Sequence, residues 1–308
     1  MCIRDSTHTH THYTLYVGQV ILDKQSNIRT VVNKTNQIDD TFRFFKMEVL
    51  AGDNDFIATV KENGCTFTFD FSKVYWNSRL ISEHERLVNE LERANVVLDV
   101  FAGVGPFAVP AARRGCVVYA NDLNPHSYEY LCANAKKNGV VKRLKAYNLD
   151  GREFIQQVTH NLLQPLKELS TGQSTSSVSK NLYTDVIMNL PATAVEFLDT
   201  FKGLFSCVPA EHRDSIQLPT VHCYCFSKSE DTPEDDCLQV VLRNLGIASL
   251  LDGTYSTHTV RRVAPNKVMV KVTFRLPTEV AFHSSEGSLP AGSVSTNPSA
   301  VEEGSGEW

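Results

Sequence analysis

A glycine turn in the middle of the chain has the residue types that bind a nucleoside. The segment Asp99–Gly105 reads DVFAGVG and follows a hydrophobic run. Glycines at Gly103 and Gly105 let the backbone approach a ligand closely. The dinucleotide pattern GxGxxG is not met, since Ala108 stands at its third glycine position, and Pro106 removes an amide that a pyrophosphate would use. The turn predicts a nucleoside-type cofactor without a pyrophosphate, which disfavours a nicotinamide oxidoreductase.

Two acidic turns follow at the ends of the next two predicted strands. Asp122 and Leu123 end the second strand, where an acid can accept hydrogen bonds from both ribose hydroxyls of an adenosine. Asp150 and Gly151 end the third strand, where a carboxylate can meet the adenine amino group. Each is an ordinary turn when taken singly. In this order, at successive strand ends, they line one crevice at the carboxyl edge of a sheet.

A fourth turn, Asn189-Leu-Pro191-Ala, ends the fourth predicted strand. An Asn followed by a rigid Pro presents side-chain and backbone acceptors to the same crevice. Such a group can position a planar nitrogen nucleophile beside a methyl donor. The alternative is a turn that only ends a strand, but its place beside the cofactor edge favours a functional role.

The elements that position these turns predict an α/β fold. From residue 95 onward, hydrophobic runs alternate with helical patterns, and the turn Pro265-Asn266 joins a final hairpin. This pattern predicts a doubly wound α/β sheet with a reversed last strand. Before it, short β-rich runs, including one at 17–22, predict a small, mainly β domain. A helix is predicted over 78–93, with Ser82 and Glu85 as a capping box.

These patterns divide the chain into four parts. Residues 1–14 contain the repeat THTHTHYT and are predicted to be a non-native or disordered start. Residues 15–77 form the small β-rich RNA or substrate domain, and 78–277 the cofactor domain with a flexible insertion at 164–181. Residues 278–308, rich in Gly, Ser, Pro and Glu, are predicted to be a disordered tail.

Composition narrows the class of protein further. Hydrophobic residues make up 42% of the chain, and no stretch is long and apolar enough to predict a membrane span. The eight cysteines form no CxxC pair, which favours reduced thiols in an intracellular protein and predicts no metal site. The formal net charge of −5 disfavours a nucleic-acid partner, but two basic stretches, 130–149 and 253–278, are compatible with RNA binding.

The sequence resembles the tRNA (guanine-37 N1)-methyltransferases of archaea and eukaryotes. This resemblance implies the Rossmann-like sheet of class I methyltransferases, which matches the doubly wound pattern with a reversed last strand. The resemblance covers roughly residues 17–277 and excludes a further N-terminal domain that members of this family usually carry. It rests on the combination of eight segments: VGQVILDK, FRFFKMEVLAG, DFSKVYWNSRLISEHERL, LDVFAGVGPFAVPAA, ANDLNP, DVIMNLPATAVEFL, VHCYCFSK and VRRVAPNKVMVKVTFRLP.

The resemblance implies a role for residues that composition and spacing leave unassigned. Glu83 matches the family's general base, Arg43 the arginine that contacts the target guanine, and Asn189 with Pro191 the substrate motif. The positions implied to contact S-adenosylmethionine, together with the turn residues above, are His84, Asp99, Gly103, Gly105, Asp122, Leu123, Asp150, Gly151 and Asn189. The implied partner is a tRNA with G at position 37, bound by a monomer with no membrane attachment.

Elementary chemistry agrees with these implied roles. Guanine N1 carries a proton at neutral pH, so a carboxylate must remove it as the methyl group approaches. Charge then shifts onto O6, where a guanidinium stabilises it. A target base in an anticodon loop can be turned out and stacked on an aromatic ring, for which Phe44, Tyr75 and Trp76 are candidates. Core packing is the alternative role for each ring.

Two other functions stay open on the sequence alone. The related wybutosine-pathway enzyme transfers the aminocarboxypropyl arm of the same cofactor and shares its binding turns. A catalytically silent RNA-binding homologue is the other, and the presence of Arg43, Glu83 and Asn189 disfavours it. The scattered cysteines predict an intracellular location, and the sequence leaves the cytoplasm, the nucleus and the mitochondrial matrix open.

Overall fold

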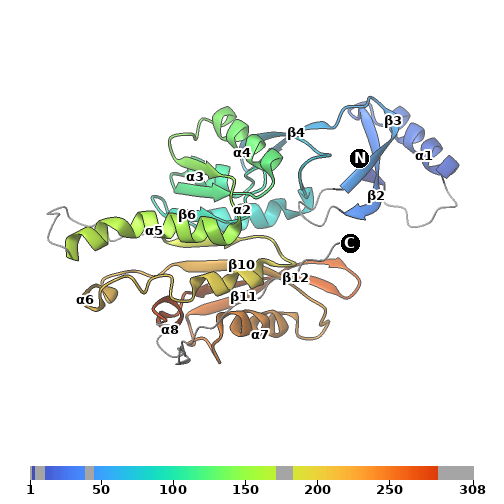
Figure 1. Ribbon diagram of the computed structural model, residues 1–308. Helices are drawn as coiled ribbons and strands as arrows, with labels where there is room; N and C mark the ends of the chain where they lie inside the picture. The colour runs from blue at the N-terminus through green and yellow to red at the C-terminus, as the bar shows by residue number, and fades with distance from the viewer. Residues whose placement is uncertain (1, 4–10, 39–44, 171–182, 284–308) are drawn as a thin grey trace, which may run out of the picture.

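The computed structural model describes residues 2–3, 11–38, 45–170 and 183–283, and its centre is a seven-stranded sheet (Figure 1). The strand order is β11-β12-β10-β9-β6-β7-β8. The bounds of these strands are β6 Val96–Asp99, β7 Val117–Asn121, β8 Leu144–Tyr147, β9 Asp185–Met188, β10 Thr220–Ser227, β11 Tyr255–Ala264 and β12 Lys267–Arg275.

The strand directions confirm the predicted topology. The pairs β6–β7, β7–β8, β6–β9 and β9–β10 are parallel, whereas β12 runs antiparallel to both β10 and β11. Asn266, at the predicted hairpin turn, has a φ of 54°, in the left-handed region that Asn tolerates. The sheet is therefore doubly wound with its last strand reversed, as in a Rossmann-like methyltransferase.

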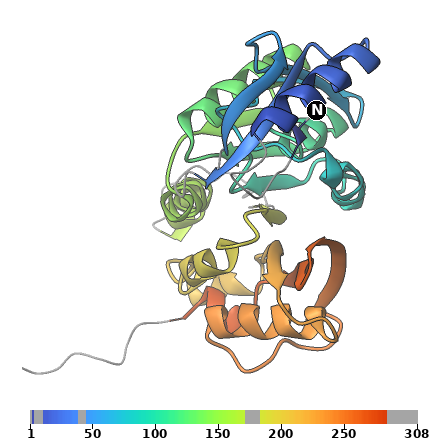
Figure 2. The same ribbon diagram turned by 90° about the vertical axis from the view of Figure 1, so that its right-hand side faces the viewer.

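Helices cover both faces of this sheet and create two hydrophobic clusters. One face packs against α2, α3 and α4, with Leu87, Ala108 and Leu131 fully buried among Val97, Val118 and Tyr224. The opposite face packs against α5, η2, α7 and α8. In Figure 2 the first half of the chain lies above its last third. The bounds are α2 Ile81–Glu90, α3 Ala108–Arg114, α4 Pro125–Lys137, α5 Gly151–Ser170, η2 Ala194–Phe201, α6 Ala210–Arg213, α7 Pro233–Leu245 and α8 Thr278–Ala281.

The N-terminal part is a separate small sheet with a helix. Its strands are β1 Cys2–Ile3, β2 Thr30–Ile38 and β3 Phe45–Gly52, and its helix is α1 Thr11–Lys24. The predicted strand at 17–22 is wrong, because these residues lie in α1. Ile21 and Leu22 pack against Val31 and Leu50, so contacts with the small sheet override the local strand preference. The prediction that 1–14 stands outside the fold also fails for the described residues of β1 and α1.

A hairpin links the small sheet to the large one. Strands β4 Ile57–Glu62 and β5 Cys65–Asp70 pair only with each other among the described strands. Two amides of α4 bind β5: Asn134 Oδ1 accepts from the Thr68 amide at 2.9 Å, and Asn138 Oδ1 accepts from the Thr66 amide at 2.9 Å. The hairpin is therefore fixed to the cofactor domain, because the α4 side chains pair the edge of β5 as a neighbouring strand would.

Two further boundaries differ from prediction. Helix α2 begins at Ile81 after a 3₁₀ turn, η1 Ser78–Leu80, whose cap is Asn77, accepting from the Arg79 amide at 3.1 Å. The predicted capping box at Ser82 is thus replaced by a cap at Asn77, five residues earlier in the chain. The predicted tail also begins too early, since Val280 and Ala281 in α8 are buried in the core. The predicted insertion lies partly in α5, and residues 171–182 lie outside the described residues.

Candidate functional site

The predicted cofactor turns converge where the strand order reverses. Strand β6 lies between β7 and β9, so the turns after these strands share one edge of the sheet. Asn121, 1% exposed, connects them: its Nδ2 donates to the carbonyl oxygens of Val100 and Leu149, and its Oδ1 accepts from the Leu149 amide at 2.9 Å. The switch point of a doubly wound sheet is where such folds bind ligands.

Asp122 holds the glycine turn in place. Its Oδ2 accepts a 2.8 Å hydrogen bond from the Gly103 amide, and its Oδ1 accepts from the Asn124 amide at 3.0 Å. Burial raises the pKa of Asp122 to about 6, against the opposing effect of these donors. Gly103 has a φ of 55°, and a side chain there would point into open space. The predicted cofactor residues Gly103 and Asp122 therefore lie in contact, next to open space that a ligand can fill.

Gly105 is required by packing. Its φ is 100°, and a Cβ at this position would lie 2.8 Å from side-chain atoms of both Leu131 and Val109. Gly151 is similar, because a Cβ there would approach the rings of Phe101 and Phe197 at 3.0 Å. Neighbouring side chains leave no space for a Cβ at either glycine. Any contact of these two residues with a cofactor, as predicted, would therefore be made by the backbone.

Asp99 differs from the other acids because it is fully buried. Its carboxylate is 0% exposed, and neither oxygen has a hydrogen-bond partner among the described residues. Burial, together with the charge of Asp122, raises the pKa of Asp99 to about 8. Asp99 is therefore a buried, neutral acid beneath the glycine turn. Its contact with S-adenosylmethionine stays a prediction.

The outer rim of the crevice is formed by Leu123 and Asp150. Leu123 is 48% exposed at the end of β7, as a hydrophobic wall for a base would be. Asp150 is exposed, and its Oδ1 accepts from the Arg152 amide at 2.9 Å as α5 begins. Asn148 joins the two turns, donating from Nδ2 to the carbonyl oxygens of Asp122 and Leu123.

The fourth turn has an unused acceptor. Asn189 Oδ1 is buried and has no hydrogen-bond partner in the described part of the chain. The peptide bond before Pro191 is trans, and the Leu190 carbonyl accepts from the amides of Thr193 and Ala194, which turns the chain into η2. A buried amide oxygen without a partner is costly unless a ligand satisfies it. Asn189 therefore fits the predicted role of holding a substrate nitrogen.

Glu83 lies at the start of α2 in a network of donors. Its side chain is 6% exposed, and Arg86 donates to both of its oxygens, from Nη2 to Oε1 at 2.7 Å and from Nε to Oε2 at 2.8 Å. Tyr224 of β10 donates its hydroxyl to Oε1 at 2.7 Å. Cys223 is paired with Met188 of β9, so Tyr224 and Asn189 each come one residue after this pair. The candidate base is thus placed next to the strand that ends in the candidate substrate motif.

His84 follows Glu83 and is fixed by a residue that sequence reasoning missed. Its Nδ1 pairs with Glu62 Oε1 at the end of β4, and both side chains are almost fully buried. The ring of His84 also meets Phe107 edge-on, at 4.6 Å between centroids, directly after the glycine turn. No local pattern marks Glu62, because the pair joins separate elements. The predicted contact of His84 with the cofactor remains a prediction.

The remaining substrate candidates divide into three cases. Arg43 and Phe44 lie outside the described residues. Trp76 packs against Phe67 and Phe69, with ring centroids 5.6 and 4.9 Å apart, so core packing accounts for it. Tyr75 is 49% exposed and is the ring among the described candidates that stays available for stacking.

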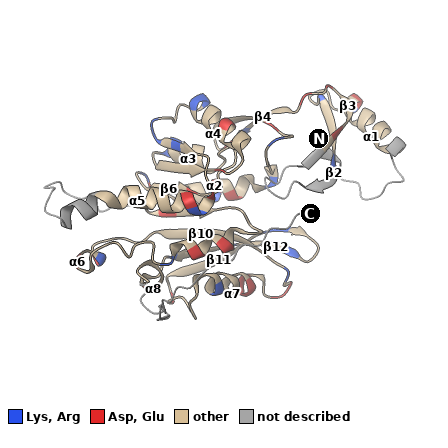
Figure 3. Cartoon of the chain, in the orientation of Figure 1, with Lys and Arg blue, Asp and Glu red and all other residues tan. Residues whose placement is uncertain are grey.

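Basic residues gather on the surface of α3, α4 and the segment that follows α4 (Figure 3). Lys136, Lys137, Lys142, Arg143 and Lys145 are all exposed, as the predicted basic stretch 130–149 requires. Two basic residues of the second stretch form ion pairs within the protein. Lys271 is 3% exposed and pairs with Glu90 at 3.1 Å, and Arg262 pairs with Glu230 at 3.0 Å. The first stretch is therefore the better RNA-facing candidate.

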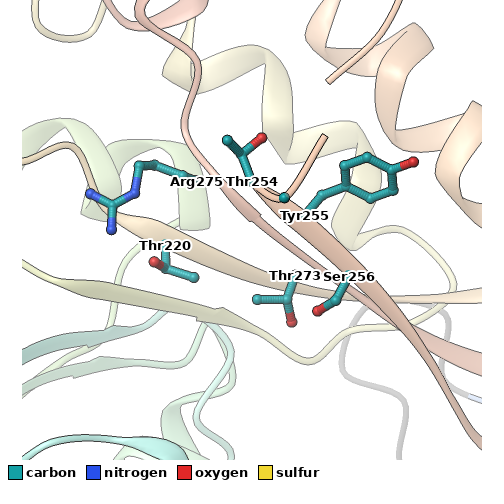
Figure 4. Close-up of a pocket in the computed structure, with 7 residues that line it drawn as sticks. Thr220, Thr254, Tyr255, Ser256, Thr273 and Arg275 are labelled. Carbon is teal, nitrogen blue, oxygen red and sulfur yellow. The ribbon is translucent and has the colours of Figure 1, made fainter. Parts of the chain in front are cut away.

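A cavity of about 360 Å³ lies at the opposite end of the sheet from the cofactor turns (Figure 4). It is lined by Thr220 at the start of β10, Arg275 at the end of β12, and Tyr255 and Ser256 at the start of β11. A second cavity, of about 560 Å³, lies between the small sheet and the β4–β5 hairpin and includes Trp76. Neither contains a predicted cofactor residue.

The described residues include neither a membrane-spanning helix nor a cluster of metal ligands. None of the helices there is long and apolar enough to cross a membrane. No group of three or more His, Cys, Asp or Glu side chains in the described part is arranged to hold a metal ion.

The doubly wound sheet with its reversed last strand, and the nucleoside-type turns at its switch point, define a Rossmann-like methyltransferase fold. The chain belongs to the TRM5/TYW2 methyltransferase family. Residues 58–168 match the TRM5/TYW2 methyltransferase domain, and residues 3–55 match the TYW2 N-terminal domain. The resemblance noted from the sequence is thereby confirmed.

Individual relatives agree with this assignment. A curated protein of Xenopus tropicalis, named tRNA (guanine(37)-N(1))-methyltransferase, is 50% identical over 270 residues, which cover 88% of this chain and 52% of the relative. The structure is similar to Trm5b from Pyrococcus abyssi, with a TM-score of 0.65 and 26% identity over 89% of this chain and 72% of the other. A complex of aTrm5 with tRNALeu has a TM-score of 0.65 at 23% identity, covering 90% and 69%. The chain spans about half the length of the curated relatives it matches.

Proposed function

We propose that this chain transfers the methyl group of S-adenosylmethionine to N1 of the guanosine at position 37 of a tRNA. The observation that carries the proposal is the position of Glu83. Its buried carboxylate is held by Arg86 of α2 and by Tyr224 of β10, and β10 lies beside β9, the strand that Asn189 follows. The names of the curated relatives and the tRNA complex of a structural neighbour support the substrate. An intracellular location and a monomeric state are parts of the same proposal.

The residues at the switch point fit S-adenosylmethionine. Asp122 accepts from the amides of Gly103 and Asn124 and from the Ser127 side chain, which leaves about one of four acceptor positions for a ribose hydroxyl. The space beside Gly103 and the exposed side chains of Leu123 and Asp150 suit an adenosine. When bound, the sulfonium cofactor supplies an electrophilic methyl group. Pro106 has no backbone N–H group, and this does not weaken binding because the cofactor has no pyrophosphate that would need such a donor.

The chain's own residues would activate and position the guanine. Glu83 takes the N1 proton, since a carboxylate oxygen with a free lone pair can accept it. Asn189 Oδ1, which has no described partner, accepts from an N–H group of the base and orients its ring. Arg86 keeps the carboxylate fixed by binding both oxygens. Arg43, outside the described residues, would stabilise the charge on O6 as the family resemblance implies.

The test is single-turnover methylation of two tRNA transcripts that carry G or A at position 37. The intact chain is expected to label the G37 transcript alone. Glu83→Gln is expected to lower the rate by about 10²- to 10⁴-fold, the usual contribution of a positioned base. Glu85→Gln is the matched control, because Glu85 is exposed on the same turn of α2. Equal rates for the two variants would remove Glu83 as the base.

The match of residues 3–55 to the TYW2 N-terminal domain keeps one second candidate function in view. A wybutosine-pathway enzyme would transfer the aminocarboxypropyl arm of the same cofactor to tRNA. Cofactor labelled in the methyl group and cofactor labelled in the carboxyl group distinguish the two reactions. Label retained in tRNA from the methyl group supports methyl transfer, and label retained from the carboxyl group alone supports the alternative.

A further inference from the structure

Three polar side chains lie in a row beneath α2, on neighbouring strands. Tyr224 of β10 is the register partner of Lys271 of β12, and Lys271 is the register partner of His258 of β11. Directly opposed residues point to the same face of a sheet. Contacts place this face under α2, because Tyr224 and His258 both approach Glu83 and Lys271 approaches Glu90. The row therefore connects the candidate base to the edge of the sheet.

The carboxylate of Glu83 has little accepting capacity left. A carboxylate offers about four acceptor positions, two on each oxygen. Oε1 accepts from Arg86 Nη2 and from the Tyr224 hydroxyl, both at 2.7 Å, and Oε2 accepts from Arg86 Nε at 2.8 Å. Among the described residues, the one free position is on Oε2. The N1–H group of a guanine needs this position if Glu83 is to remove its proton.

His258 is the group closest to that free position. Its Nε2 lies 3.8 Å from Glu83 Oε2, slightly too far for a hydrogen bond. The His258 side chain is 45% exposed, whereas that of Glu83 is 6% exposed. Solvent protons therefore reach the histidine directly. A side-chain rotation that moves Nε2 by about 1 Å would bring it within hydrogen-bond distance of Glu83 Oε2.

The charged groups around His258 come from two helices, α2 and α7, and from one strand, β12. From α2, Arg86 and Glu90 form an ion pair with each other, and Lys271 of β12 pairs with Glu90 at 3.1 Å. On the opposite face, Glu234 of α7 accepts from the hydroxyls of Thr257 and Thr259, the neighbours of His258 along β11, and from the Thr259 amide. Arg86, Glu90 and Lys271 are paired with one another, whereas Glu234 has no cation partner among the described residues and its charge interacts with that of His258. In the described part of the chain, Glu83 Oε2 is the carboxylate oxygen within 4 Å of the His258 ring.

We propose that His258 sets the acid limit of the reaction by competing with the substrate for Glu83. A protonated imidazole carries an N–H group at Nε2 and a positive charge, so it closes on Oε2 and occupies the position that guanine N1–H needs. A neutral imidazole with its proton on Nδ1 presents no donor there, and the base is free. His258 is a positioning residue in this scheme, because it acts on the reaction only through Glu83. The inference rests on the proposed function of Glu83.

The consequence is an acid limb of the rate that depends on His258. A side chain at position 258 that cannot gain a proton leaves the free position on Oε2 open to the substrate. If His258 controls the limb, replacing it with an uncharged residue therefore moves the limb to lower pH. If Glu83 alone controls it, the same replacement leaves the limb where it is.

The experiment measures single-turnover methyl transfer to a G37 tRNA transcript from pH 5 to pH 8.5, with saturating cofactor and tRNA. His258→Gln, which cannot become charged, is expected to keep its full rate to a lower pH than the wild type does. His258→Lys, which is charged throughout, is expected to lose about tenfold or more at every pH. Cofactor titration of each variant verifies that it is folded, and saturation removes the effect of Asp122 on cofactor affinity. His160→Gln, at an exposed position on α5, is the matched histidine control and is expected to follow the wild-type profile.

Two results would overturn the inference while leaving the proposed function intact. One is an active wild-type chain whose acid limb is unchanged in His258→Gln. The other is a His258→Lys variant as fast as the wild type at pH 8. A wild-type chain that transfers no methyl group at any pH would reject the proposed function itself, and the inference with it.

Discussion

The hydroxyl of Tyr224 donates a 2.7 Å hydrogen bond to Oε1 of Glu83, joining two residues 141 positions apart. Burial, together with the negative charge of Glu83, raises the pKa of Tyr224 well above its ordinary value. The phenol therefore stays protonated and remains a donor throughout the working pH range. Because α2 precedes the cofactor turns in the chain and β10 follows them, this contact fixes the candidate base relative to the sheet.

Tyr224→Phe is expected to lower the single-turnover methylation rate by about tenfold, while the affinity for S-adenosylmethionine changes little. The phenyl ring preserves the packing against Phe107, but Oε1 loses the donor that orients it. Loss of a hydrogen bond to a charged group also lowers the free energy of unfolding by about 1.5–3 kcal/mol. Rapid-quench methylation and denaturant unfolding measure the two effects.

Tyr183→Phe is the matched control for this prediction. Tyr183 is equally buried and its hydroxyl lies 3.0 Å from Thr159 Oγ1, in the core on the other face of the sheet. A loss of about 0.5–1.5 kcal/mol in stability, as for a bond between neutral groups, without a change in methylation rate is expected. The role of Tyr224 in positioning Glu83 would be refuted by equal methylation rates in the two variants.

The cofactor half of the fold was predictable because its signals are local. A buried strand followed by glycines and an acid specifies the turn at Gly103 without information from elsewhere in the chain. The small N-terminal sheet was less predictable. The run at 17–22 contains β-branched residues that favour a strand, yet Ile21 and Leu22 pack in α1 against Leu50. Tertiary packing decided the outcome there.

The candidate site divides in the same way. The acids at Asp122 and Asp150 stand at strand ends, so their convergence follows from the topology. Glu62 and Tyr224 are different, because each reaches its partner through a contact between distant elements. The alternation of β10 placed Cys223 and Cys225 on one face and thus Tyr224 on the other, but nothing in the sequence identified Glu83 as the group it would meet. Pairs of this kind require the packed structure.

Glu62→Ala is expected to destabilise the protein by about 3–5 kcal/mol, the usual effect of removing one partner from a buried pair. Glu62 and His84 are almost fully buried, and their contact holds the β4–β5 hairpin against α2. Denaturant unfolding followed by tryptophan fluorescence measures the change, since Trp76 packs against Phe69 of this hairpin.

Glu62→Gln keeps an acceptor for His84 and is expected to recover at least half of that loss. Glu48→Ala is a control at an exposed acid of the small sheet, where little change in stability is expected. If the two Glu62 variants were equally destabilised, packing rather than the pairing with His84 would explain the effect.

Cofactor affinity is expected to fall as the pH drops below about 6. Burial raises the pKa of Asp122 to about 6, so the carboxylate that accepts from Gly103 becomes protonated in this range. A protonated acid loses the acceptor capacity that ribose hydroxyls need, and the dissociation constant should rise by about tenfold per pH unit below 6. Calorimetric titration with S-adenosylmethionine between pH 5 and pH 8 tests this. Asp122→Asn should bind weakly with no such slope, and a wild-type affinity that is constant over the range would contradict the role of Asp122.

Asp99→Asn is expected to make the cofactor-free protein more stable at alkaline pH. Burial and the nearby Asp122 raise the pKa of Asp99 to about 8 in the folded state, whereas an unfolded aspartate titrates near 3.9. Between these values the folded state holds a proton that the unfolded state has released, so the free energy of unfolding falls as the pH rises, by about 1.4 kcal/mol per unit. The stabilisation by this group is complete below about pH 4 and lost above pH 8.

Since the Asn variant has no such proton, urea unfolding from pH 5 to pH 9 should show its advantage in stability growing to about 5 kcal/mol. Asp185→Asn is the control of opposite sign: hydrogen bonds from His222 lower the pKa of Asp185 against the effect of burial, so its removal should destabilise the protein at neutral pH. Parallel pH profiles for the wild type and Asp99→Asn would show that Asp99 is not the buried, unpaired acid that this structure describes.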